Sequence, residues 1–315
     1  MVLIDHANRA MGPNNAETIG LHGVTIFFVL SGFLITTGLM REKEATGRID
    51  LRKFYIRRFF RLMPCAWNFL LFALVMAMLS PERSVALSNI IAALFFFRNY
   101  AQLFVPNYAL TGHFWSLSIE EQFYLIWPSL LILLGMHRAR WFAVAGATAI
   151  AIYRFAHWSN IVVPWGTHVR ADALLAGCAV ALFLPTIRKW LRAWMAIPLL
   201  TGLVLCIIRY RGLIPLHESA IIALLLAVTS SSESALFRIL DWKPVAFLGT
   251  ISYSLYVWQQ PYALAVFSHS MQPLAAVLEL FGIALISYFF LEEPLVVLGH
   301  KLTPATSPDP TLAPH

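Results

Sequence analysis

Side chains that can carry a proton or bind a polar group gather at the start of one long apolar stretch. Glu120 and Glu121 stand side by side there, and apolar residues continue to Leu134. A charge near the core of a bilayer costs roughly 2.5–3.5 kcal/mol on insertion scales, so function is the default hypothesis for it. Steps of three and four residues on a helix place five side chains of this block on one face: His113, Ser116, Glu120, Tyr124 and Trp127.

The two carboxylates differ in whether a purely structural role can explain their presence. Ser118 and Glu121 have the spacing of a capping box, in which Glu121 would only satisfy free N–H groups at the start of a helix. Glu120 has no such explanation. We therefore expect Glu120 to be functional, with Glu121 at most in a supporting role.

His6 is the leading candidate for a general base. An imidazole takes a hydroxyl proton near neutral pH, and a neighbouring carboxylate such as Glu120 would orient the ring and stabilise the imidazolium. A lone histidine near a helix end is more commonly an interfacial residue, so that alternative stays open. His113 is the next candidate base.

Three arginines, Arg57, Arg58 and Arg61, lead into a second apolar stretch. Guanidinium groups pair with phosphate oxygens in a bidentate manner. Because Arg58 and Arg61 lie three residues apart on one helical face, they could share one anionic ligand. The alternative for each arginine is an anchor that determines topology by contacting anionic headgroups.

Four further polar residues lie in or beside apolar stretches: Arg170, Asp172, Tyr253 and Glu292. Structural pairing between helices and contact with a substrate are about equally expected for Arg170 and Asp172. Interhelical hydrogen bonding explains much of the hydroxyl-rich segment around Tyr253. The small residues Ser31 and Gly32 indicate close approach of two helices, without a catalytic role.

The composition predicts an all-α membrane protein that crosses the bilayer many times. Of the 315 residues, 59% are hydrophobic and 12% are charged, whereas about a quarter of a soluble protein is charged. Eight of the 23 Lys and Arg residues lie between Arg41 and Arg61, which indicates a cytoplasmic membrane-surface loop rather than nucleic-acid binding. The three cysteines indicate neither a disulfide framework nor a metal site: Cys65, Cys178 and Cys206.

Apolar stretches predict about nine complete spans and a truncated first helix, because residues 1–8 fall short of the roughly 20 that a span needs. The complete spans are expected near residues 21–40, 62–80, 118–136, 141–157, 169–186, 193–209, 216–231, 246–267 and 274–292. Segment 85–97 is marginal in length. The main basic loops share the cytoplasmic side only if 85–97 does not cross, so we expect 85–103 to form a re-entrant or surface helix.

This topology predicts one membrane domain over residues 1–301 and a disordered cytoplasmic tail over residues 302–315. The residues predicted toward the outer side are His6, Glu120, Arg170 and Asp172. The basic loop and Glu292 fall toward the cytoplasm. Polar groups on both faces of one bundle suggest a path between them.

The motifs of this chain resemble acyltransferase family 3, the integral-membrane O-acyltransferases. The resemblance rests on VLSGFLI at 29–35, FYIRRFFR at 54–61, HFWSLSIEEQFYLIWP at 113–128, RADAL at 170–174, ISYSLY at 251–256 and LEEP at 291–294. Where many members have Trp-His-Gln-Pro, this chain has Gln259 in place of the histidine.

The resemblance implies ten helices in the cell inner membrane and transfer of an acetyl or other short acyl group to a hydroxyl of a surface carbohydrate, such as lipopolysaccharide or peptidoglycan. It implies that His6 is the catalytic histidine and that the pattern from Arg58 to Arg61 matters for activity. Acyl-CoA, in the first place acetyl-CoA, would be the donor substrate, and no cofactor would be bound permanently.

Two other function classes stay open. A transporter or flippase of a glycan or lipid-linked intermediate would also need buried charges, but it should show repeated halves with broken helices, and the sequence shows no repeat. An inactive relative kept as a membrane partner is favoured by the truncated first helix. The sequence does not predict an oligomeric state.

Overall fold

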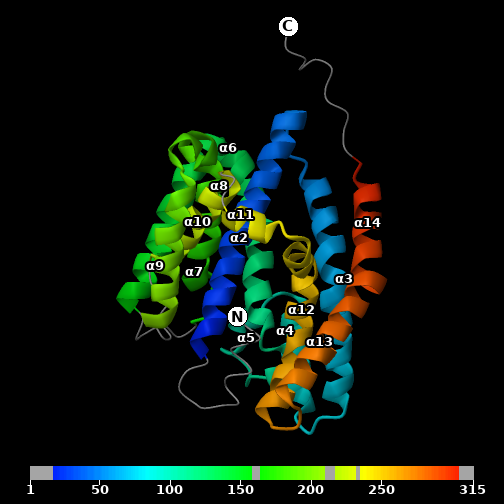
Figure 1. Cartoon of the computed structure of the whole chain (residues 1–315). Helices are drawn as coiled ribbons and strands as arrows, with labels where there is room; N and C mark the ends of the chain where they lie inside the picture. The colour runs from blue at the N-terminus through cyan, green and yellow to red at the C-terminus, as the bar shows by residue number, and fades with distance from the viewer. Residues whose placement is uncertain (1–16, 158–163, 210–216, 232–234, 305–315) are drawn as a thin grey trace.

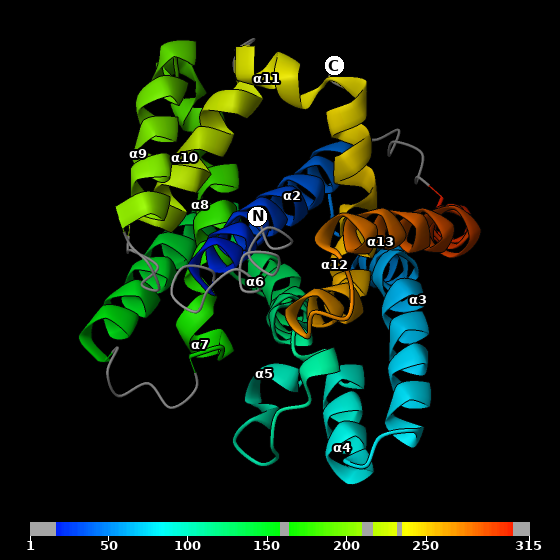
Figure 2. The ribbon, with the colours of Figure 1, turned by 60° about the horizontal axis from the view of Figure 1, so that its bottom comes forward.

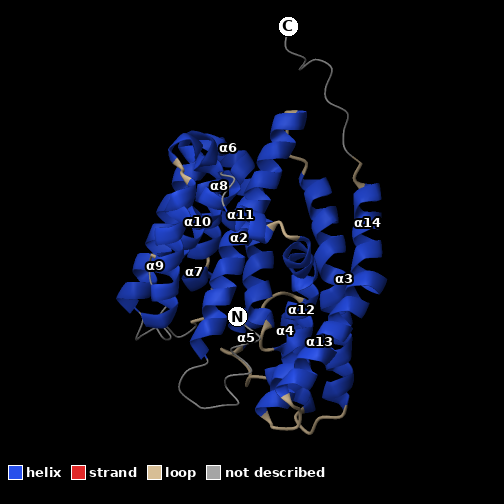
Figure 3. Cartoon of the chain, in the orientation of Figure 1, coloured by secondary structure: helices blue, strands red, loops and turns tan. Residues whose placement is uncertain are grey.

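The computed structural model describes residues 17–157, 164–209, 217–231 and 235–304. These residues form helices joined by short turns, without strands (Figure 3), which confirms the all-α prediction. The longer helices are α2 (Glu17–Thr46), α3 (Leu51–Met78), α4 (Arg83–Leu94), α6 (Phe114–His157), α8 (Asp172–Ile187), α9 (Ala196–Arg209), α10 (Glu218–Ser231), α12 (Lys243–Phe267), α13 (Pro273–Ser287) and α14 (Glu293–Leu302). The shorter elements are α5 (Arg98–Ala101), α7 (Thr167–Arg170), α11 (Ala235–Leu240), a π-helical turn, Tyr288–Glu292, between α13 and α14, and three 3-10 turns, Ala109–Thr111, Arg188–Trp190 and Ala193–Met195.

Several helical segments are long and apolar enough to cross a membrane. Within the described residues they are Gly20–Thr46, Leu51–Met78, Phe114–His157, Asp172–Trp190 and Pro273–Leu302. The protein is therefore a multi-pass membrane protein. Helices α9 and α10 have 14 residues each, fewer than the roughly 20 that a span needs. The count of nine or ten spans accordingly stays a prediction.

Helix α6 is not one straight helix. Gly135 has φ 68° and ψ 162°, a conformation that only glycine adopts readily, and the helix breaks there. On a straight helix, Gln122 and Arg154 would lie about 48 Å apart. Instead, Gln122 hydrogen-bonds the hydroxyl of Thr167, and Arg154 hydrogen-bonds the carbonyl of Val169, two residues further on. The chain therefore reverses direction at Gly135, as expected for two separate predicted spans.

Helix α2 runs between two groups of helices (Figures 1 and 2). On one side it packs against α8, with α6 and α10 beside it, and on the other lie α3, α12, α13 and α14. Each group has its own hydrophobic cluster. Phe28, Trp127 and Leu174 belong to the first cluster, and Phe69 and Trp258 belong to the second. The helices that meet between these two clusters position the polar residues described below.

Two glycines bring the backbones of α2 and α8 into direct contact. A Cβ atom on Gly32 would lie 2.0 Å from the carbonyl oxygen of Leu174, and one on Gly177 would lie 2.0 Å from the carbonyl oxygen of Val29. Neither position can accept a larger side chain without moving a helix. This confirms the close helix approach predicted at Gly32.

A buried arginine holds the chain that leads into α6. Arg98 is 4% exposed, and its guanidinium donates to Asn107, to the carbonyl of Tyr108 at 3.4 Å and to the hydroxyl of Thr111 at 3.3 Å. Burial lowers the pKa of Arg98 to about 10. The neighbouring helix α4 has 12 residues, too few for a span, and the proposal that 85–103 does not cross stays a prediction.

Candidate active site

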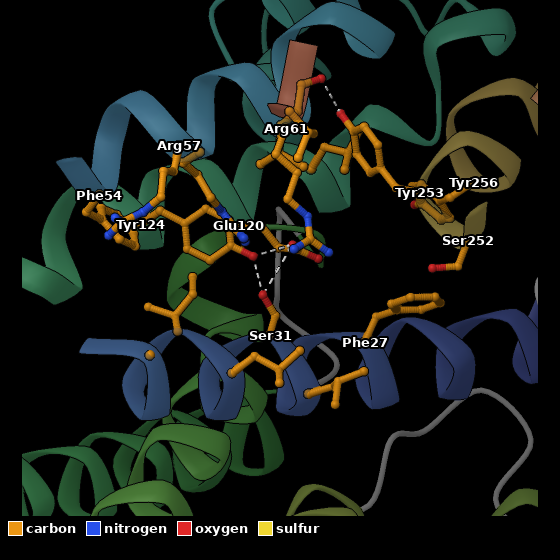
Figure 4. A pocket seen from close by; sticks show the side chains of 18 of the residues that line it. Phe27, Ser31, Phe54, Arg57, Arg61, Glu120, Tyr124, Ser252, Tyr253 and Tyr256 are labelled. Carbon is orange, nitrogen blue, oxygen red and sulfur yellow. Dashed lines mark hydrogen bonds between the residues drawn. The ribbon is translucent and has the colours of Figure 1, made fainter. Parts of the chain in front are cut away.

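A cavity of about 480 Å³ opens between α2, α3, α6, α12 and α14 (Figure 4). The polar residues that line it are Ser31, Glu42, Arg57, Arg58, Arg61, Ser116, Glu120, Tyr124, Ser252, Tyr253, Tyr256 and His300. The cavity thus brings together seven of the side chains that the sequence analysis considered for chemistry: Arg57, Arg58, Arg61, Ser116, Glu120, Tyr124 and Tyr253. Most of the apolar wall comes from α2, between Val24 and Leu39.

Glu120 lies at the centre of a small hydrogen-bonded cluster. The hydroxyl of Tyr124, one helical turn further along α6, donates to Glu120 Oε2 at 2.6 Å. Ser31, from α2, donates to the same oxygen at 3.4 Å and also hydrogen-bonds the Tyr124 hydroxyl (Figure 4). Two hydroxyls therefore converge on one carboxylate oxygen inside the cavity.

Two arginines of α3 face this cluster. The guanidinium carbon of Arg58 lies 3.9 Å from the centre of the Tyr124 ring, which is a cation–π contact. The Nε atom of Arg58 has no hydrogen-bond partner among the described residues. Arg58 interacts electrostatically with both Glu120 and Glu121. The side chain of Arg61 extends into the cavity toward Glu120 (Figure 4). Positive charge therefore surrounds the carboxylate and the phenol ring.

The cavity carries an excess of positive charge. Arg57 is partly neutralised, because its Nη2 lies 3.6 Å from Glu42 Oε2. Three arginines and two glutamates line the cavity, so an anionic group would be favoured there. The sequence placed Glu120 and Arg58 toward opposite faces of the membrane. The structure instead brings them together, because both line the same cavity and interact electrostatically.

His113 packs behind the cavity and does not line it. Its Nε2 donates to the carbonyl of Val257 at 2.9 Å, and its ring meets Phe69 edge-on. The backbone carbonyl of His113 accepts from Tyr256 at 3.0 Å, and the Tyr256 hydroxyl also hydrogen-bonds Ser116 Oγ. His113 therefore joins α12 to the start of α6, and Ser116 and Tyr256 present their hydroxyls to the cavity.

Tyr253 and Glu292 occupy different environments. Tyr253 lines the cavity and donates to the carbonyl of Leu62 at 2.8 Å. Glu292 is buried in the π-helical turn and accepts from Ser254 at 2.7 Å and from Ser287 at 2.8 Å. Glu292 does not line the cavity, so its contacts support the packing of α12 against the π-helical turn.

The capping box expected at Ser118 and Glu121 is absent. Helix α6 begins at Phe114, four residues before Ser118, so no free N–H groups stand at this point. Ser118 Oγ instead donates to the carbonyl of Phe114 at 2.9 Å and accepts from the backbone N–H of Arg98 at 3.1 Å. Glu121 is half-buried and does not cap a helix.

Arg170 and Asp172 make structural contacts, one of the two alternatives left open by the sequence. Asp172 accepts from Arg154 at 2.7 and 2.9 Å and from Ser219 at 3.3 Å. Arg170 reaches the hydroxyl of Thr25 at 3.5 Å. These contacts join α8 to α6 and α10, and α7 to α2, and none of these residues lines the cavity.

One buried pair was missed by the sequence analysis. His22 Nδ1 lies 2.8 Å from Glu218 Oε1, and both side chains are buried between α2 and α10. The sequence signal for this pair was Glu218, a single acidic residue at the start of an apolar stretch. Nothing in the sequence indicates that His22, 196 positions away, is its partner.

A family comparison decides the assignment. The model of an acyltransferase domain, that of acyltransferase family 3, matches residues 1–291. The chain belongs to this acyltransferase family. The match confirms the resemblance seen in the sequence, and it covers every residue that lines the cavity except Val296 and His300.

Relatives of this chain are named as O-acetyltransferases, and two of the names specify peptidoglycan. The chain is 31% identical to peptidoglycan O-acetyltransferase OatA of Listeria monocytogenes over 77% of this chain and 44% of the relative. It is 30% identical to O-acetyltransferase OatA of Staphylococcus aureus over 90% of this chain and 53% of the relative. A Bacillus subtilis protein, YrhL, whose name assigns it provisionally as a peptidoglycan O-acetyltransferase, is 32% identical over 90% of this chain and 51% of its own length. The chain thus spans about half the length of these relatives, and no solved structure matches it.

Two candidate residues, His6 and Ser31, need separate mention. His6, the expected general base, lies outside the described residues. Ser31 was expected to serve helix packing alone, yet it faces the cavity while the adjacent Gly32 makes the helix contact. Successive helical residues point about 100° apart, so a packing motif can carry a cavity residue at its edge.

Proposed function

We propose that the chain is the membrane domain of an O-acyltransferase that transfers an acetyl or other short acyl group from acyl-CoA to a hydroxyl of a peptidoglycan-type carbohydrate. Family membership supports the reaction class. The names of the relatives favour peptidoglycan over lipopolysaccharide as the acceptor. The observation that carries the proposal is the convergence of Glu120, Tyr124 and Ser31 with three arginines in one cavity.

The arginine side of the cavity fits the donor. Acyl-CoA carries several phosphates, and guanidinium groups bind phosphate oxygens in a fixed planar geometry. Arg58 and Arg61 belong to the end of the basic loop predicted on the cytoplasmic side, and they line the same cavity as Glu120.

His6 is proposed as the base for the acceptor. It takes the proton of the carbohydrate hydroxyl, whose oxygen then forms a bond to the acyl carbon, and the thioester carbon–sulfur bond ends as a free CoA thiolate. Glu120 lies where a carboxylate can support this charge movement. The enzyme is proposed to work in the cell inner membrane, with the lipid bilayer as its surroundings.

A transfer assay tests this function. Membranes that contain the protein are incubated with labelled acetyl-CoA and either muropeptides or lipopolysaccharide, and the sugars are analysed by mass. We expect label on the muropeptides, and Glu120→Gln should lower the rate roughly a hundredfold or more. Glu121→Gln is the matched control, because this adjacent carboxylate does not line the cavity. Transfer at the full rate with both Glu120→Gln and His6→Ala would refute the proposed roles, and absence of any labelled sugar would refute the function.

A further inference from the structure

Ser31 presents a hydroxyl to the cavity beside a base. Its Oγ hydrogen-bonds the Tyr124 hydroxyl and donates to Glu120 Oε2 at 3.4 Å, and Tyr124 donates to the same oxygen at 2.6 Å. The carboxylate oxygen can only accept, so the Ser31 proton has a continuous hydrogen-bonded route toward Glu120, directly or through Tyr124. A hydroxyl connected to a base is the arrangement of a covalent nucleophile.

We propose that Ser31 is the nucleophile of a two-step reaction and carries the acyl group as an ester between donor and acceptor. This inference rests on the proposed acyl transfer. In place of a direct attack of the acceptor on acyl-CoA, Ser31 first attacks acyl-CoA, and the acceptor then attacks the Ser31 ester.

In the first step, Ser31 Oγ attacks the carbonyl carbon of the acyl thioester. A carbon–oxygen bond forms, the carbon–sulfur bond breaks, and CoA leaves as a thiolate. The Ser31 proton moves along the hydrogen bonds to Glu120, which becomes a neutral acid.

In the second step, the carbohydrate hydroxyl attacks the Ser31 ester. Its proton goes to the base proposed above, His6, and its oxygen forms the new ester bond. The bond between the acyl carbon and Ser31 breaks, and Ser31 recovers its proton from Glu120 through Tyr124. Over both steps one acyl group and one hydroxyl proton are transferred, and nothing is oxidised or reduced, so no further reactant is needed.

The other hydroxyls of the cavity are less suited to this role. Ser252 donates to the carbonyl of Gly249 in its own helix at 2.8 Å and is not bonded to a carboxylate. Ser116 donates to the carbonyl of His113 at 3.2 Å and contacts a tyrosine. Tyr124 is 1% exposed, whereas Ser31 is half-buried and faces the open space. Ser31 is therefore both accessible from the cavity and hydrogen-bonded to a base.

A serine ester makes a prediction that direct transfer does not make. The enzyme should exchange label between free CoA and acetyl-CoA with no carbohydrate present, because the first step is complete before the acceptor enters. We would measure this exchange in membranes that contain the full chain, and would analyse the α2 peptide by mass after acid quenching. The transfer to muropeptides is measured in parallel.

Three variants give the comparison. Ser31→Ala should lower exchange and transfer about a hundredfold or more and leave α2 unlabelled. The control Ser88→Ala should keep exchange, transfer and α2 labelling, because Ser88 lies outside the cavity and donates to the carbonyl of Ser84 in its own helix. Ser31→Cys keeps a nucleophile, so it guards against a folding defect and should trap the acyl group as a thioester that neutral hydroxylamine cleaves. Membrane abundance is measured for each variant.

Each outcome decides between the two proposals. Exchange together with acylated Ser31 supports the serine ester. Labelled muropeptides without exchange, with Ser31→Ala near the wild-type rate, would overturn the serine ester and leave the proposed function intact. Acyl groups found on Tyr124 in place of Ser31 would also overturn it. No labelled muropeptide and no exchange would overturn the proposed function and this inference with it.

Discussion

Arg154 holds Asp172 through two hydrogen bonds, of 2.7 and 2.9 Å, between the second part of α6 and the first turn of α8. Both side chains are buried, at 3% and 4% exposure. The same guanidinium donates to the carbonyl of Val169 at 2.8 Å. The pair thus fixes the returning part of α6 against the chain that enters α8.

Removing one partner of this pair should destabilise the protein strongly. Asp172→Leu leaves a buried, unpaired guanidinium, which costs about 3–5 kcal/mol. Replacing both residues, as in Arg154→Met with Asp172→Leu, should recover much of that loss because no charge is left unpaired. Thermal unfolding of the detergent-solubilised protein measures both effects. An Asp172→Leu variant as stable as the double variant would contradict this account.

The contact between α2 and α8 should not tolerate a methyl group. Gly177→Ala places a Cβ 2.0 Å from a backbone oxygen of α2, and overpacking of this kind costs about 1–3 kcal/mol or more. Gly38→Ala is the matched control on α2, since a Cβ there meets nothing within 4 Å and alanine favours a helix by about 0.5–1 kcal/mol. Unfolding midpoints should therefore move in opposite directions. Equal unfolding midpoints for the two variants would show that α2 and α8 can move apart to admit a methyl group without loss of stability.

Exchange of the cavity arginines for lysine should weaken donor binding without loss of insertion. Arg58→Lys and Arg61→Lys keep the charge but lose the planar fork, so the KM for acyl-CoA should rise while membrane abundance stays constant. Arg52→Lys serves as control, because Arg52 is exposed on the same helix and does not line the cavity. An unchanged KM in the Arg58→Lys, Arg61→Lys double variant would mean that these charges only determine topology.

The segment around α4 should leave its two ends on one side of the membrane. Reporters placed after Pro81 and after Asn107 should both face outward, because the 12 residues of α4 cover about 18 Å, less than the roughly 30 Å of the hydrocarbon core. Accessibility labelling from the outside of intact cells measures this. Reporters on opposite sides would mean that the segment crosses.

Periodicity and residue chemistry predict a large part of the site. The i, i+4 spacing correctly groups Ser116, Glu120 and Tyr124 on one face of α6, and the paired arginines of α3 do line the same cavity. These predictions succeed because each concerns one helix, where 3.6 residues per turn relate spacing directly to direction.

Relationships between distant helices are not predicted by the sequence. His22 pairs with Glu218 across 196 positions, and no local pattern specifies which apolar helices touch. The capping box at Ser118 failed for a related reason, since capping depends on where the helix begins and α6 begins one turn earlier. The assignment of Ser31 to packing failed because a small residue serves helix contact or a polar surface equally well until the neighbour is known.

The contact of Gly32 and Gly177 between α2 and α8 has a consequence for how this chain can vary. Ser31 adjoins Gly32, so the depth and rotation of Ser31 within the cavity depend on a backbone contact with α8. Helix α8 contributes nothing to the cavity wall itself. A substitution at Gly177 should therefore lower activity by more than its loss of stability explains, although the residue never meets a substrate.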